Sequence, residues 1–170
     1  MAAAMRAGVP REDIFLSVKI GVGWFGPTST MFKFPGLLKE LGVTYVDLLS
    51  LHYPFQPGEG EPPQKQVHQD TWRLLDRLRA KGQVRDLGVS NFGIEQMEEL
   101  LELKLAPIAA NQLEYSPWVP ARHREVADWC HKHGIAVSGY CSAEPVVLLA
   151  ATERLGFPRV TARAALADLP

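Results

Sequence analysis

The stretch VDLLSLHYP, residues 46–54, is a run of apolar residues that ends in a histidine, a tyrosine and a proline. Its apolar residues fall on both sides of the alternation of a β-strand, which predicts a strand buried on both faces. Pro54 has no backbone N–H, so we expect the strand to stop near His52. A titratable imidazole at the end of a buried strand makes His52 a candidate functional residue.

Similar apolar runs recur along the chain and alternate with amphipathic stretches that end in glycine. The predicted strands are 13–18 with Lys19 at the end, 43–51, 83–92, 107–115 and 135–142; the predicted helices are a short one in 34–42, then 65–82, 93–105, 120–134 and 146–156. Alternation of this kind predicts parallel strands joined by right-handed crossovers. A doubly wound sheet and a (β/α) barrel both fit. Residues 157–170 have no assignment.

Composition limits the class of protein. The 170 residues are enough for one domain with a core, with 46% hydrophobic and 22% charged residues. A net charge of −1 gives no basic surface for nucleic acid, and no run reaches a membrane span. The N-terminus lacks the apolar region of a secretory signal. Cys130 and Cys141 are expected to be reduced thiols in a cytoplasmic protein, and no metal site is expected.

Polar or titratable side chains end every predicted strand. They are Lys19; His52; Ser90 and Asn91; Asn111 and Gln112, with Glu114 beyond; and Tyr140, followed by Ser142. Ligands of parallel α/β proteins bind at the carboxyl ends of the strands. A barrel brings all these ends to one mouth, whereas a doubly wound sheet does not.

Each residue also has a structural interpretation. Lys19 alone is typical of a surface lysine, and His52 of a structural histidine. Ser90 and Asn91 could cap the helix that follows, and Gln112 could anchor a loop. Tyr140 could belong to the core with its hydroxyl at the rim. The occurrence of all of them on one predicted rim favours a site.

The motifs IFLSVKI, LGVTYVDLLSLHYP, TWRLLDRLRAKGQVRDLGVSNF, NQLEYSPW and HKHGIAVSGYCS resemble the successive strand motifs of the aldo-keto reductase family. They occur in the family's order and cover residues 5–142. The resemblance implies a TIM-type (β/α)8 barrel, of which this chain would carry strands three to seven. It also implies NADPH bound across the mouth of the barrel and hydride transfer to a small aldehyde or ketone.

The resemblance implies a role for individual residues. Lys19 and His52 match the lysine and histidine of the family's catalytic set. Ser90, Asn91 and Gln112 match the residues that bind the nicotinamide carboxamide. Tyr140 matches the aromatic residue that stacks on the nicotinamide, and Ser142 matches a contact to a cofactor phosphate.

Other family features have no match in this sequence. The catalytic aspartate and tyrosine belong to strands that would precede Met1, and Tyr45, Tyr53 and Tyr115 do not lie at the matching place. The segment around Arg159 and Arg163 does not match the family's 2′-phosphate site. We therefore expect a fragment of a barrel, able to pair through open sheet edges and inactive or nearly inactive alone.

Two alternatives stay open at this point. The chain could be a non-catalytic nucleotide-binding or regulatory module related to reductases. It could also be an unrelated doubly wound protein, because Gly21, Gly23 and Gly26 spell GxGxxG; we expect no helix to open in WFGPTST, as that fingerprint requires. The substrate and the choice between NADPH and NADH are not determined.

Overall fold

The computed structural model describes residues 2–58, 60 and 62–141. The strands are β1 (Ser17–Ile20), β2 (Val46–Leu51), β3 (Val84–Ser90), β4 (Ile108–Glu114) and β5 (Ala136–Tyr140). The helices are α1 (Ala2–Arg6), α2 (Pro27–Leu41), α3 (Gln64–Ala80), α4 (Ile94–Leu101) and α5 (Ala121–Lys132), with 3-10 turns η1 (Arg11–Asp13) and η2 (Val22–Trp24). The predicted helix at 146–156 lies outside the described residues.

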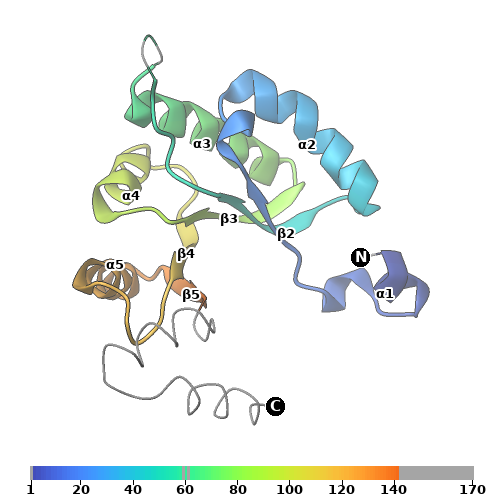
Figure 1. Ribbon diagram of the computed structural model, residues 1–170. Coiled ribbons are helices and arrows are strands. Elements are labelled where there is room, and N and C mark those ends of the chain that lie inside the picture. Colours follow the sequence, from blue (N-terminus) through green and yellow to red (C-terminus); the bar gives the residue numbers. More distant parts are fainter. Residues whose placement is uncertain (1, 59, 61, 142–170) are drawn as a thin grey trace.

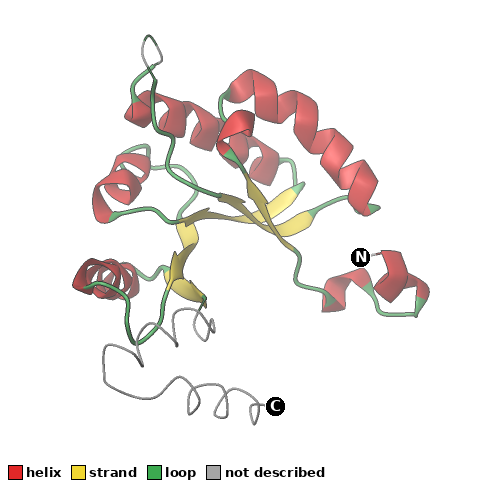
Figure 2. Ribbon diagram, in the orientation of Figure 1, coloured by secondary structure: helices red, strands yellow, loops and turns green. Residues whose placement is uncertain are grey.

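The strands form one parallel sheet in the order β1-β2-β3-β4-β5. Crossovers of one hand that always step to the next strand in the same direction bring all the helices to one face. Helices α2, α3, α4 and α5 follow one another around the outside of the curved sheet (Figures 1 and 2). A doubly wound sheet would reverse its strand order, so the sheet is an arc of a (β/α) barrel.

The two faces of the sheet differ in chemistry. On the helix-covered face, the core includes Leu49, Leu51, Leu87 and Val89, packed with the fully buried Trp72 of α3. The opposite face carries polar or small residues that pair across neighbouring strands: Lys19 with Ser50, Ser50 with Gly88, Gly88 with Ala110, Ser90 with Gln112, Gln112 with Ser138, and Glu114 with Tyr140. Parallel pairing in register thus collects the polar side chains on one concave surface.

Helix α2 is longer than the sequence predicted. It runs from Pro27 to Leu41 and passes through Pro35, where the sequence suggested a helix start. Thr30, Phe34 and Leu38, each four residues apart, form a buried stripe on α2. Packing of this stripe outweighs the backbone hydrogen bond that Pro35 cannot donate.

The expectation that no helix opens in WFGPTST was therefore wrong. Gly26 caps the start of α2, so the glycines at 21, 23 and 26 do lie between a strand and a helix. Two of these glycines form hydrogen bonds within the protein: Gly26 N donates to Thr71 Oγ1 at 2.9 Å, and the Gly21 carbonyl accepts from Trp24 N at 2.9 Å. The strand order, rather than the motif, excludes the dinucleotide-binding fold.

Gly88 marks the tightest approach on the concave face. A Cβ at this position would lie 2.6 Å from Ser50 Oγ, 3.0 Å from the Ala110 carbonyl oxygen and 3.2 Å from Leu48 Cδ1. The absence of a side chain lets β2 and β4 both close on β3. Gly88 is thus required for packing and not for a turn.

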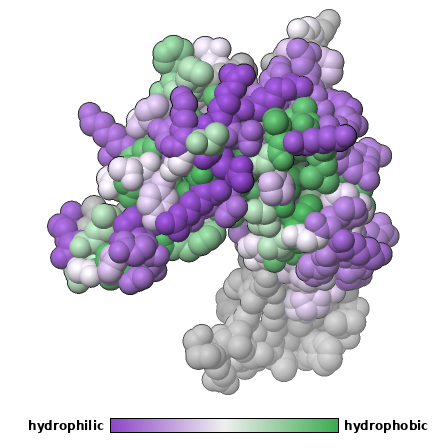
Figure 3. All heavy atoms as spheres, turned by 180° about the vertical axis from the view of Figure 1, so that it is seen from behind, coloured by the Kyte–Doolittle hydropathy of each residue, from purple (hydrophilic) through white to green (hydrophobic). Residues whose placement is uncertain are grey.

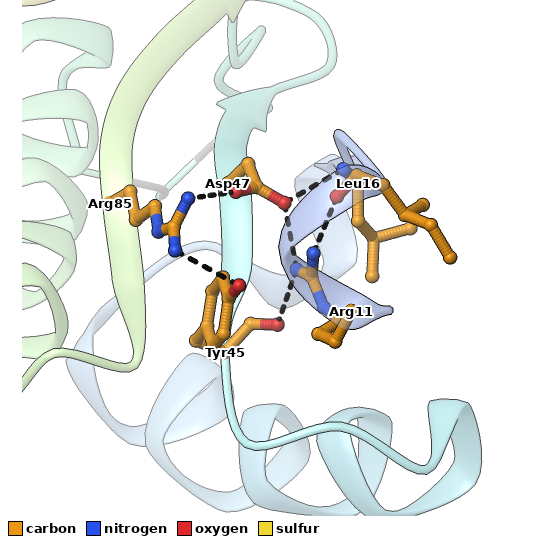
Figure 4. Close-up of polar contacts among 6 residues, drawn as sticks. Arg11, Leu16, Tyr45, Asp47 and Arg85 are labelled. Atoms are coloured by element: carbon orange, nitrogen blue, oxygen red, sulfur yellow. Dashed lines mark hydrogen bonds and ion pairs between the residues drawn. The ribbon is translucent and has the colours of Figure 1, made fainter. Parts of the chain in front are cut away.

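An ion-pair cluster joins the amino-terminal ends of β1, β2 and β3 (Figure 4). Asp47 Oδ2 accepts from Arg11 Nη2 at 2.7 Å and from the Leu16 N–H at 2.8 Å, and Oδ1 accepts from Arg85 Nη1 at 3.0 Å. Both guanidinium groups lie over the Tyr45 ring, 4.0 and 4.4 Å from its centroid. The Asp47 side chain is 4% exposed, so the carboxylate depends on these partners.

Burial alone would raise the pKa of Asp47. The Leu16 N–H, the hydrogen bond and charge of Arg11 and the charge of Arg85 outweigh it and hold the pKa below its ordinary value. The folded state therefore favours the carboxylate.

Polar side chains cover most of the described surface in the view from behind, with hydrophobic areas between them (Figure 3). Among the described residues, no helix has the length and apolar character needed to span a membrane. Phe15 and Phe32 are the most exposed large hydrophobic side chains described, at 71% and 80%.

We expect Gly88→Ala to lower the free energy of unfolding by roughly 1–3 kcal/mol, because the new methyl group overpacks the junction of three strands. Adding Ser50→Ala should recover part of the loss by removing the closest atom. Urea denaturation measures both effects. Gly36→Ala in α2 is the matched control, since a Cβ there meets nothing within 4 Å. Equal effects of Gly88→Ala and Gly36→Ala would contradict the packing argument.

Asp47→Asn should lower the free energy of unfolding by about 3 kcal/mol at pH 7, because it leaves a largely buried Arg11 unpaired. The folded pKa of Asp47 lies below the unfolded value of about 4, so its contribution is present above that pH and lost as pH falls through the folded pKa. The difference in the free energy of unfolding between wild type and Asp47→Asn should therefore be smaller at pH 3 than at pH 7. Urea denaturation at the two pH values would measure it.

Arg85→Gln is the control for this series, since the Arg85 side chain is 54% exposed. This substitution should lower the free energy of unfolding by about 1 kcal/mol or less. If Asp47→Asn lowers the free energy of unfolding by the same amount at pH 7 and at pH 3, the carboxylate charge is not what stabilises the cluster.

Candidate active site

The carboxyl ends of all five strands meet around one hollow of about 310 Å³. Lys19, His52, Tyr53, Ser90, Asn91, Gln112 and Tyr140 line it. Of the seven residues to which the family resemblance gives a role, six therefore lie together, and the seventh, Ser142, lies outside the described residues. The volume is at the lower end of the range for small-molecule sites.

Gln112 connects the two sides of the hollow. It points from β4 onto the concave face, where its Oε1 accepts from Lys19 Nζ and its Nε2 donates to Ser138 Oγ at 3.3 Å. Lys19 is the third residue of β1 and is exposed on the same face. A chain of polar groups thus spans the sheet from β1 to β5. Among the described residues, the hydrogen-bond partner of Lys19 is an amide and not a carboxylate or a phenol.

Asn91 joins three strand ends. Its backbone has φ 63°, in the left-handed region that asparagine tolerates better than most residues. Its Nδ2 donates to the His52 carbonyl at 3.0 Å and to Ser90 Oγ at 3.1 Å, and its Oδ1 accepts from the Tyr140 hydroxyl at 2.7 Å. These bonds fix the amide plane of Asn91 against β2, β3 and β5.

Tyr140 is held as a neutral phenol. Burial, and after it the nearby Tyr53 and Glu114, raises the pKa of Tyr140 above its ordinary value. The hydroxyl therefore keeps the proton that it donates to Asn91 Oδ1. This hydrogen bond orients the ring at the wall of the hollow.

Ser90 and Asn91 do not cap helix α4, as their structural interpretation would require. The cap residue is Gly93, whose N–H donates to Gln96 Oε1 at 2.7 Å. Ser90 Oγ instead donates to the Gln112 carbonyl at 3.0 Å. Both side chains thus line the hollow and have no role in starting the helix.

The loop after β2 adds a residue that the sequence reasoning did not assign. The Tyr53 ring stacks on His52 with centroids 4.5 Å apart and is 49% exposed. The available signal was its position directly after a strand end. The loop is anchored by His68, whose Nε2 accepts from the Phe55 N–H at 2.8 Å. Burial lowers the pKa of His68 to about 4, so the imidazole is neutral at pH 7.

Asn111 does not line the hollow, although the sequence placed it at the rim beside Gln112. It lies inside β4 and pairs in register with Val89 and Val137 on the helix-covered face. Neighbouring residues of a strand point to opposite faces, so only Gln112 reaches the concave side.

Comparison with known proteins identifies the family. The sequence model described as the aldo/keto reductase family matches residues 1–144. A curated relative, glyoxal reductase of Bacillus subtilis, is 33% identical over 135 residues, which cover 79% of this chain and 45% of the relative. The chain spans about half the length of the curated relatives it matches.

Solved structures of the same family share the fold. The crystal structure of an aldo/keto reductase from Brucella melitensis is 30% identical with a TM-score of 0.73, covering 90% of this chain and 58% of that chain. An aldo-keto reductase of the silkworm, complexed with NADPH, is 25% identical with a TM-score of 0.72, covering 91% of this chain and 52% of that chain.

The five strands thus correspond to part of the complete barrel found in these relatives. The family model matches well over half of the sequence, and the structural matches extend over nine-tenths of it. On these findings, the chain belongs to the aldo/keto reductase family.

Proposed function

We propose that the chain supplies the residues that orient a nicotinamide cofactor and a carbonyl substrate for NADPH-dependent reduction of small aldehydes or ketones. The observation that carries the proposal is that Lys19, His52, Asn91, Gln112 and Tyr140 line one and the same hollow in a member of this family. The NADPH complex of the silkworm relative and the glyoxal reductase of B. subtilis support the cofactor and substrate classes.

The residues of the hollow fit a nicotinamide. A carboxamide has one NH2 donor and one carbonyl acceptor, and the amides of Asn91 and Gln112 offer both complements, with Ser90 Oγ beside them. The neutral Tyr140 ring offers an apolar face for stacking. The hydrogen bonds of Tyr140 to Asn91 and of Lys19 to Gln112 occupy these groups in the structure. Cofactor binding would exchange them for bonds to the carboxamide.

His52 and Lys19 are assigned to the carbonyl. When bound, the reduced nicotinamide supplies the hydride. An imidazole N–H of His52 orients the carbonyl oxygen, on which negative charge develops, and the Lys19 ammonium stabilises that charge. The Tyr53 ring stacks on His52 and limits the orientations of the imidazole.

Proton transfer is the step that the described residues support least. The family's tyrosine and aspartate have no counterpart among the matched motifs, and Lys19 bonds to Gln112. Loss of a general acid lowers rates by roughly 10²–10⁴-fold. We therefore propose that the 170-residue chain binds NADPH but reduces carbonyls slowly or not at all by itself.

A second candidate function is a non-catalytic nucleotide-binding subunit that pairs with a partner. Strands β1 and β5 each have one hydrogen-bonded neighbour among the described strands, which favours it. Unpaired strand edges are templates for pairing with another chain. A shift from monomer to complex in analytical ultracentrifugation, with NADPH bound and no turnover, would favour this function over the first.

Gln112→Leu should weaken NADPH binding by about tenfold, since it removes the donor and the acceptor of the side-chain amide from the hollow with a modest change in volume. Saturable quenching of NADPH fluorescence by the purified chain gives the dissociation constant. Gln66→Leu, at an exposed position on α3, is the control and should leave affinity unchanged. Equal affinity of the two variants would rule out the hollow as the nicotinamide site.

Turnover is tested separately from binding. The purified chain with NADPH and a small dicarbonyl such as glyoxal should show little NADPH oxidation at 340 nm, because no matched motif supplies the family's catalytic tyrosine and aspartate. Robust oxidation that is lost in His52→Ala would refute the proposed inactivity and still support the site. An NADH arm of the same assay measures cofactor preference.

A further inference from the structure

Asn111 is a fully buried amide just behind the proposed nicotinamide site. Its relative exposure is 0%, and it faces the layer between the sheet and helices α4 and α5. Its Nδ2 donates to the Phe92 carbonyl at 3.0 Å. Phe92 follows Asn91 directly, so this bond reaches the turn that carries a proposed carboxamide ligand.

The remaining contacts of Asn111 are weak or missing. Its Nδ2 lies 3.4 Å from Met97 Sδ and 3.8 Å from Cys130 Sγ, and its Oδ1 has no hydrogen-bond partner among the described residues. Burying an amide with an unpaired oxygen is unfavourable, whereas an apolar side chain of the same branching, such as leucine, would bury no unpaired polar atom. The bond to Phe92 is thus the one strong interaction of this amide.

The hydrogen bond from Asn111 to the Phe92 carbonyl restrains a strained stretch of backbone. Asn91 has φ 63°, a conformation that persists when the surroundings overdetermine it. Two consecutive residues of β4 provide this restraint. The Gln112 carbonyl accepts from Asn91 N at 2.9 Å and from Ser90 Oγ at 3.0 Å, and Asn111 Nδ2 holds the Phe92 carbonyl on the other side of Asn91.

We propose that Asn111 is a positioning residue: it holds the left-handed turn at Asn91 and so directs the Asn91 amide into the cofactor site. The inference rests on the proposed function of Asn91 as a carboxamide ligand. Asn111 itself faces away from the hollow and acts only through the turn.

The chemistry restricts which side chain can do this. The Phe92 carbonyl needs a donor, which an amide provides and a carboxylate or an alkyl group does not. Asn111→Leu keeps the branching and the number of side-chain heavy atoms and removes the donor, so it is the informative substitution. Met97→Leu is the matched control, since it alters the same buried cluster and leaves the bond to Phe92 intact.

Asn111→Leu should raise the NADPH dissociation constant of the chain by about three- to tenfold, the effect of one lost hydrogen bond. Met97→Leu should change it by less than about twofold. Because Asn111 acts through Asn91, the double variant Asn91→Ala/Asn111→Leu should bind no more weakly than Asn91→Ala alone. Additive losses, or an affinity of Asn111→Leu equal to wild type, would overturn the inference.

Amide hydrogen exchange by NMR tests the turn without any cofactor. In Asn111→Leu, the Asn91 N–H should exchange at least about tenfold faster, while amides of β5 keep their protection. Unchanged exchange at Asn91, or faster exchange throughout the sheet, would overturn the positioning role. If wild type fails to bind NADPH, the proposed function fails, and this measurement still decides whether Asn111 holds the turn.

Discussion

The parallel pairing of five strands is the constraint on which the rest of the structure depends. Lys19 pairs with Ser50, Ser50 with Gly88 and Gly88 with Ala110, so one level of the concave face crosses four strands. The ladder between β3 and β4 shifts its register between Leu87 and Gly88, next to this level. A slip of one residue in any strand would turn its polar side chain into the helix layer and an apolar one into the hollow. The narrow fit at Gly88 disfavours such slips, because a side chain there would meet both neighbouring strands.

The two ends of the sheet differ in their chemistry. At the amino-terminal end, the buried Asp47 pairs with Arg11 and Arg85 and joins three strands by charge. At the carboxyl end, the hollow is lined by Lys19, His52, amides, hydroxyls and aromatic rings, and Glu114 pairs with Tyr140 beside it. A barrel that separates its structural ion pairs from its site in this way can vary one without disturbing the other.

Consecutive residues of strand β4 line the site and hold the turn behind it. Gln112 faces the hollow and Asn111 faces the helices, yet both bind the same turn around Asn91. Tyr140 then closes the arrangement from β5 through its hydroxyl. The orientation of Asn91 is thus set from three strands, which explains how a left-handed asparagine is kept in one conformation.

The sequence by itself determined the order of strands and helices and the residues at the strand ends, because hydrophobic period, glycine stops and motif spacing are local properties. The alternation of strands and helices alone left the barrel and the doubly wound sheet unresolved, since strand order depends on contacts between distant residues. The family resemblance predicted the barrel, and the strand order confirmed it. It also missed the full length of α2, where packing of Phe34 outweighs Pro35. Tertiary structure alone decided that Gln112 faces the hollow and Asn111 the core, because a face is defined only once neighbouring strands are paired.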